Sequence, residues 1–238
     1  MLTKTKAIVL KTTKYADASI IAKVYTEQMG LVSLLFQGVR KSRYNKASII
    51  QPSYIITVDI YLKQNKSLFN VKEFSLANLY LHINNDFSKQ AILLFACELL
   101  NKSVREQEEN QALYNYVEQF FIMIDYSDEK LAHLPLLFFY QLAAYLGFEP
   151  LNNYSIHQPY FNMVNGEFEK MPNTRHQNLS IEDSLLMHQF LSFVTSNSFS
   201  SLSKINRTKL LDIWTNYYKI HLAEFHSLNS IKILQEVL

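Results

Sequence analysis

The chain has little of the residues that build disulfides, nucleotide-binding loops and membrane spans. It contains 238 residues, of which one is cysteine (Cys97), four are glycine and five are proline. A single cysteine cannot form an internal disulfide or supply a cysteine-based zinc cluster, and this scarcity is typical of a reducing compartment. No apolar run approaches the roughly 18 to 20 residues that span a bilayer, and the apolar run at 7–10 is too short for a signal peptide. We therefore expect a cytoplasmic protein without a membrane partner.

The sequence also lacks the patterns that carry catalysis. The string Gly38–Ser42 has some likeness to a phosphate-binding P-loop, but Arg40 stands where the second glycine is required. The seven histidines form no i, i+4 pair with a neighbouring Glu, and there is no Gly-x-Ser-x-Gly elbow. A nuclease with an attached binding domain is the alternative from a different class, but the first third has only four widely spaced carboxylates to hold a metal. We expect no enzymatic activity, no cofactor and no bound metal.

Positive charge, by contrast, is concentrated in the first third of the chain. Residues 1–78 contain 12 Lys/Arg and 4 Asp/Glu, whereas residues 79–238 contain 11 and 17, a division that the net charge of +2 hides. A surface patch of one sign indicates a polyanionic ligand. The densest part is Gly38–Lys46 (GVRKSRYNK), with four cations in nine residues. This segment is typical of a loop that contacts phosphate, and a loop kept charged only for solubility is the alternative.

The first third predicts a small β-barrel. Segments rich in β-branched and aromatic residues are separated by turn residues, and they lie at 6–13, 19–26, 31–37, 49–62 and 67–76. Pro52 requires an edge or a bend at the start of the fourth segment. Five short strands in about 75 residues favour a five-stranded OB-fold barrel over a small sandwich, which is the alternative. We therefore expect an OB-fold domain at 1–78 that binds a polyanionic ligand.

The remainder predicts an all-α domain at 79–238. Apolar residues at helical spacing indicate helices at 91–100, 110–125, 134–146, 181–195, 206–225 and 230–237. Between about 150 and 180 this spacing disappears, and Asn165-Gly166 predicts the turn of a small β-hairpin. The predicted fold class is thus α+β in two domains, a barrel followed by a helical domain with a hairpin insertion.

Several strings, taken in order, resemble the amino-terminal domain of the RecO family of bacterial DNA-repair mediators. They are Lys6–Thr12 (KAIVLKT), Tyr25–Glu27 (YTE), Gly38–Ser42 (GVRKS) and Gln51-Pro52. Near the other end, Leu228–Leu234 (LNSIKIL) is similar to the last helix of the family. The resemblance thus covers the whole chain.

The resemblance implies an OB-fold followed by a helical domain in a protein that binds single- and double-stranded DNA. Family members anneal complementary strands and, with RecR, help to load the RecA recombinase onto DNA coated with single-strand-binding protein (SSB), without bond-breaking chemistry. The implied partners are DNA, the SSB C-terminal tail, RecR and, indirectly, RecA, and the implied location is the bacterial nucleoid. A generic OB-fold RNA-binding protein is the alternative.

The resemblance also implies which residues contact DNA. Arg40, Lys41 and Ser42 match the family string, whereas Arg43 and Lys46 are added on charge alone. For the acidic SSB tail, the basic candidates in the rest of the chain are Lys102, Arg105, Arg207 and Lys209.

Many family members carry a four-cysteine zinc module after a Gly-x-x-Pro step, which here is Gly147–Pro150. None of those cysteines is present in this chain. We therefore expect a hairpin without metal, held by packing of Tyr160, Phe161 and Phe168.

Overall fold

The computed structural model describes residues 2–42, 46–62, 67–105, 109–127, 131–172, 177–196 and 202–237. Packing divides the chain into two compact units, Met1–Glu129 and Lys130–Glu236. The first unit contains the barrel and also two helices that the sequence assigned to the helical domain. The predicted domain boundary between residues 78 and 79 stays a prediction. The division between the two compact units falls later in the chain, after Glu129.

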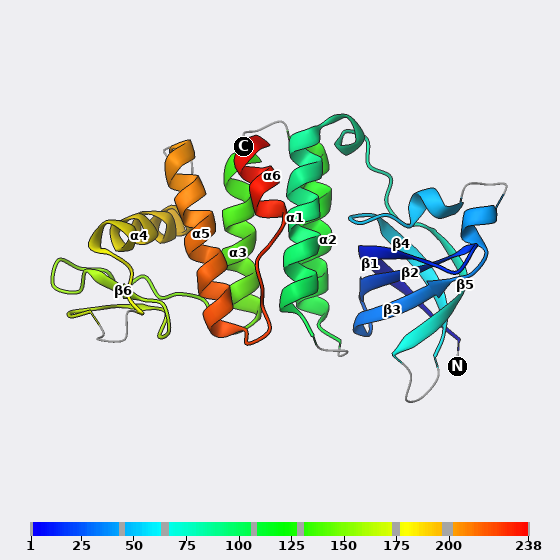
Figure 1. Ribbon diagram of the computed structural model, residues 1–238, viewed down its shortest axis with the longest axis horizontal. Coiled ribbons are helices and arrows are strands. Elements are labelled where there is room, and N and C mark those ends of the chain that lie inside the picture. The colour runs from blue at the N-terminus through cyan, green and yellow to red at the C-terminus, as the bar shows by residue number, and fades with distance from the viewer. Residues whose placement is uncertain are drawn as a thin grey trace. The chain divides into compact units, whose positions relative to one another are not determined.

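Five strands close into a barrel in the order β1-β2-β3-β5-β4, shown in blue to cyan in Figure 1. Their bounds are β1 (Leu2–Tyr15), β2 (Ser19–Thr26), β3 (Gly30–Phe36), β4 (Ile55–Tyr61) and β5 (Leu68–Leu76). Neighbouring strands are antiparallel, except that β3 and β5 are parallel. This closed five-stranded barrel is the predicted OB-fold.

The alternation of residues explains why these strands close around a core. On β2, Ala22 and Val24 point inward, and on β3 Val32, Leu34 and Phe36 do the same. The expected bend at Pro52 is confirmed, because β4 begins only at Ile55. Before it come a 3₁₀ turn, η2 (Lys46–Ile49), and Ser53 in a left-handed conformation with φ of 75°.

Two helices pack on the outside of the barrel within the first unit. They are α1 (Phe87–Ser103), capped by the Asp86 side chain, and α2 (Gln111–Tyr126). Tyr25 on β2 stacks with Tyr114 on α2 at a centroid distance of 6.2 Å, and the Cys97 thiol donates to the Val9 carbonyl at 3.6 Å. Burial raises the pKa of Cys97 to about 12, so this thiol is an inert core group.

In its described residues, the second unit is built from four α-helices and a hairpin. The helices are α3 (Leu134–Tyr145), α4 (Ile181–Ser196), α5 (Lys204–His221) and α6 (Ser230–Val237), and the hairpin strands are β6 (Tyr160–Asn162) and β7 (Glu167–Glu169). Trp214 on α5 is fully buried and stacks with Phe139 on α3 at 6.0 Å. In the described part of the chain, no helix has the length and apolar character needed to cross a membrane.

Helix α5 ends earlier than the predicted 206–225. It stops at His221, and the chain then turns through a hydrogen bond from the Phe225 N–H to the Leu222 carbonyl. This turn lets the Phe225 ring pack against Tyr218 at 5.3 Å. Tertiary packing, rather than apolar spacing, therefore sets the end of the helix.

Candidate nucleic-acid interface

The predicted basic segment leaves the barrel directly after β3. Gly38 has φ of 71°, a left-handed conformation that glycine adopts at little cost, and it turns the chain into the 3₁₀ turn η1 (Val39–Lys41). Val39 is buried in the barrel core, whereas Lys41 beside it is exposed. One apolar anchor thus holds the turn and presents the cations to solvent.

Arg40 has a structural role that the sequence did not predict. Its backbone N–H donates to the Ala18 carbonyl at 2.9 Å, and its guanidinium Nη1 donates to the Ala16 carbonyl at 3.2 Å. Both acceptors lie in the loop between β1 and β2, so Arg40 ties the basic segment to that loop. The residue is still exposed, and a guanidinium carries further N–H donors that can meet a ligand.

The other predicted contact residues lie on the same segment. Ser42 is half-buried after η1, and Lys46 is exposed at the start of η2, which contacts η1. Arg43 lies outside the described residues. The structure therefore brings Arg40, Lys41, Ser42 and Lys46 into one region of the barrel end.

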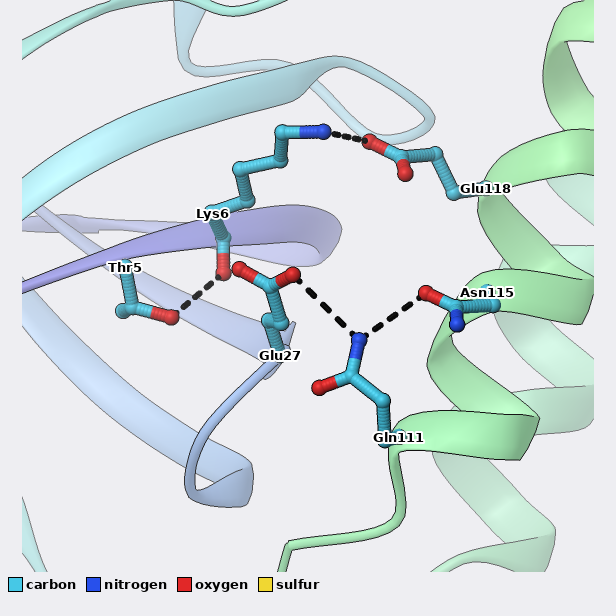
Figure 2. A network of polar contacts seen from close by, with 6 residues as sticks. All are labelled: Thr5, Lys6, Glu27, Gln111, Asn115 and Glu118. Atoms are coloured by element: carbon cyan, nitrogen blue, oxygen red, sulfur yellow. Dashed lines mark hydrogen bonds and ion pairs between the residues drawn. The ribbon is translucent and has the colours of Figure 1, made fainter.

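Some cations of the barrel are already balanced by acidic groups. The Lys6 ammonium on β1 pairs with the Glu118 carboxylate on α2 at 2.9 Å, as Figure 2 shows. Next to this pair, the Gln111 side chain on α2 donates to Glu27 at 3.3 Å and to Asn115 at 2.9 Å. This part of the barrel surface is thus occupied by α2.

A second part of the barrel surface has mixed charge. Lys4 on β1 lies opposite Asp59 on β4, which in turn lies opposite Glu73 on β5. With Thr57, Phe74 and Ser75 these residues line a shallow hollow of about 130 Å³. The surface that α2 occupies and the surface around this hollow both include residues from the first half of β1. Both surfaces therefore contribute little net positive charge.

The β1–β2 hairpin carries two cations on its outer face. Lys11 and Lys23 are register partners across the two strands, and the register shifts between Val9 and Lys11. Without this bulge, simple alternation from the inward-facing Val9 would turn Lys11 into the barrel interior. The extra residue, Leu10, is buried, and Lys11 is exposed.

Lys23 lies in an unfavourable electrostatic environment. Its side chain is partly buried, and this burial, followed by repulsion from Lys11 and Arg105, lowers the pKa of its ammonium below the usual value. Arg105 follows Val104, the C-cap of α1, and its effect on Lys23 together with the contacts between α1 and β1 brings the end of α1 near the hairpin. In the sequence, Lys11 and Lys23 count only toward the total charge of residues 1–78. The signal that could have found them is the inward parity of Lys11, because a lysine at an inward position requires a bulge.

The hairpin of the second unit is held by side-chain amides as well as by packing. Phe161 and Phe168 are buried and their rings lie 5.0 Å apart, as predicted, while Tyr160 is only half-buried. The Asn153 amide donates to the Phe168 carbonyl at 3.1 Å and accepts from the Phe168 N–H at 2.7 Å. Asn162 accepts from two backbone N–H groups and donates to Glu169.

These groups do not fit the zinc of the four-cysteine module that the family resemblance led us to look for at this hairpin. Zinc takes thiolate, imidazole or carboxylate ligands, and the amides of Asn153 and Asn162 already satisfy the backbone. Among the described residues, no three His, Cys, Asp or Glu side chains gather as a metal site.

Comparison with known proteins agrees with this architecture. The family model described as Recombination protein O N terminal matches residues 1–80, and that described as Recombination protein O C terminal matches residues 84–229. The DNA repair protein RecO of Bacteroides fragilis is 32% identical over 242 residues, which cover 100% of this chain and 99% of the relative. Those of Flavobacterium johnsoniae and Christiangramia forsetii are 30% and 29% identical, with the same coverage. The chain belongs to the RecO family.

Proposed function

We propose that this chain is a mediator of DNA repair and recombination that binds single- and double-stranded DNA and anneals complementary strands. Together with RecR, it helps to load RecA onto DNA coated with SSB. The observation that supports the proposal most is an OB-fold of strong positive charge whose basic segment is tied by Arg40 to the β1–β2 loop. Strand faces and the β1–β2 loop are where OB-folds bind oligonucleotides.

The physical basis of annealing is the screening of phosphate charge. Two strands repel each other through their phosphates, and Lys and Arg side chains bound to these phosphates reduce that repulsion. Contacts to phosphate do not read the bases, which stay free to pair. The activity therefore needs no bond-breaking group and no bound metal, in keeping with a non-enzymatic protein of the bacterial cytoplasm and nucleoid.

The test compares two pairs of lysines that carry the same total charge. The variant Lys41→Ala/Lys46→Ala removes two exposed cations of the basic segment and leaves the bonds of Arg40 intact. The control Lys4→Ala/Lys72→Ala removes two exposed cations from strands β1 and β5. We expect the first variant, and not the control, to lower the slope of log affinity against log salt for single-stranded DNA by roughly 1.4.

The same variants should differ in annealing of SSB-coated oligonucleotides, with the loss confined to Lys41→Ala/Lys46→Ala. Equal slopes and equal annealing rates in both variants would remove the basic segment from the proposal. Competition between single-stranded DNA and RNA of equal length, with SSB pull-down, separates the mediator from the RNA-binding alternative. Preference for RNA without SSB capture would favour the alternative.

The SSB tail requires a local basic site in an otherwise acidic part of the chain. Two of the predicted candidates are already paired, because Lys102 binds Glu98 at 2.8 Å and Lys209 binds Glu182 and Asp183. Arg207 donates to the Leu202 carbonyl at 2.7 Å. Crosslinking with the tail peptide locates this contact, and RecR pull-down tests the second partner.

A further inference from the structure

The β1–β2 hairpin keeps two like charges side by side at a cost to the fold. Like charges directly opposite on neighbouring strands destabilise a sheet, and partial burial of Lys23 adds a further cost. A bulge is nevertheless present and turns Lys11 toward its partner rather than inward. Bulges are common beside binding sites, where they re-aim a side chain.

The α1 end adds a third cation to the same place. Arg105 follows the α1 C-cap, Val104, and acts electrostatically on Lys23, so this charge comes from outside the barrel strands. Among the residues that the structure describes, no carboxylate is one of the groups that act on the Lys23 ammonium. The charges that act on Lys23 thus favour a bound anion at this place, irrespective of the other contacts of Arg105.

We propose that Lys11, Lys23 and Arg105 form a composite phosphate site, and that a single strand of nucleic acid runs from it along the outer face of the β1–β2 hairpin. This inference rests on the proposed function and extends the interface to a residue outside the barrel. It is separate from the basic segment that the sequence predicted.

Features farther along the hairpin favour a nucleic acid over an acidic peptide. Tyr15 has the same outward parity as Lys11 and is 49% exposed, four residues or about 13 Å along β1. An exposed ring between cations provides a surface on which a base stacks. Beyond it, Arg40 is bonded to the loop that follows Tyr15, so the cations continue along one path.

The experiment measures binding of a labelled oligodeoxyadenylate over a range of salt concentrations. The variant Lys11→Gln/Lys23→Gln should lower the slope of log affinity against log salt by roughly 1.4. For each tenfold dilution of salt, the affinity of this variant should therefore rise by a factor roughly 25-fold smaller than that of the wild type. Arg105→Gln alone should lower it by roughly 0.7. Lys4→Gln, on the same strand as Lys11, is the matched control and should change neither affinity nor slope.

Tyr15→Ala provides a readout of a different kind. Loss of stacking should weaken binding by about 5-fold or more and leave the salt slope unchanged. Thermal unfolding of each variant confirms folding, which the removal of repelling charges should not impair.

The outcomes separate this inference from the proposed function. If wild-type protein fails to bind the oligonucleotide, both are overturned. If wild type binds and Lys41→Ala/Lys46→Ala lowers the slope while Lys11→Gln/Lys23→Gln does not, the function stands and the composite site is wrong. An unchanged slope in Arg105→Gln overturns the part played by α1. Binding of an acidic peptide that depends on Lys11 and Lys23, with DNA binding unaffected, overturns the nucleic-acid ligand.

Discussion

Lys23 on the barrel face is partly buried and Asp125 at the end of α2 is fully buried in the same unit, yet their surroundings are opposite. Lys23 lies opposite another cation, and its lowered pKa means that the protein disfavours its charge. The Asp125 carboxylate accepts from the N–H groups of Leu81, His82 and Ile83 at 2.8 to 2.9 Å. Burial alone would raise the pKa of Asp125, but these three bonds lower it, so its charge is favoured.

Structural and functional charges differ in whether the fold already satisfies them. Asp125 closes the segment that leads from the barrel to α1, and Lys89 donates to its backbone carbonyl at 2.9 Å. Its bonding capacity is used within the fold. Lys23 has the opposite character, since the fold holds it at a cost that an incoming anion would relieve.

Replacing Asp125 should have the largest effect. Asp125→Ala leaves three backbone N–H groups without their acceptor, and we expect it to lower the free energy of unfolding by about 3 to 5 kcal/mol. Urea denaturation measures this loss. Asp125→Asn keeps one acceptor oxygen, so its free energy of unfolding should lie between those of the wild type and Asp125→Ala. Equal stability of all three proteins would contradict the structural role of Asp125.

The contribution of Asp125 should also depend on pH. Because its pKa in the folded protein is lowered from 3.8, its contribution is complete above the unfolded value and is lost as the pH falls through the folded one. The stability difference between wild type and Asp125→Asn should be constant from pH 7 to about 5 and shrink below about 4. A difference that grows on acidification has the wrong sign for this account.

In the hairpin of the second unit, the uncharged Asn153 amide has a stabilising role to be compared with the effects of Lys23 and Asp125. Asn153→Ala removes both amide bonds to Phe168 and should destabilise the protein by about 2 kcal/mol, measured by thermal or urea unfolding. Treatment with a chelator should leave the unfolding midpoint of wild type unchanged. A chelator-induced drop would show that a metal, rather than Asn153, holds the hairpin.

Neutralising Lys23 should have the smallest effect and the opposite sign. Lys23→Gln removes repulsion with Lys11 and should stabilise the protein by about 0.5 kcal/mol, with Lys4→Gln as control. The same substitution should weaken DNA binding, so we expect stability and affinity to move in opposite directions. Destabilisation by Lys23→Gln would indicate that Lys23 has a structural role like that of Asp125.

Local pattern was enough to predict the barrel, the hairpin and the approximate helices. Alternation in β2 and β3, the bend at Pro52 and the turn at Asn165-Gly166 are properties of adjacent residues. The bulge at Leu10 and the link from Arg40 to Ala16 were not predictable, because they depend on which strands and loops meet in space.

The same reason explains why packing and sequence divide the chain at different places. Alternating strands end before residue 79, but α1 and α2 cover the part of the outer side of β1 and β2 around Tyr25 and leave Lys11 exposed. The bonds of Asp125 join residues more than 40 positions apart, and the sequence holds no local sign of them. Within the candidate site, the basic segment could be predicted from the density of charge in the sequence. Lys11 and Lys23 could be identified only from the register of β1 and β2.

The most direct test is the pKa of the Lys23 ammonium, measured by NMR titration without and with a bound oligodeoxyadenylate. We expect a pKa below the usual lysine value in the free protein and a rise on binding, because the phosphate attracts the ammonium that Lys11 and Arg105 repel. Lys4 serves as the reference signal and should not respond to the oligonucleotide. A Lys23 pKa that stays unchanged while DNA is bound would show that this face of the barrel does not hold the strand.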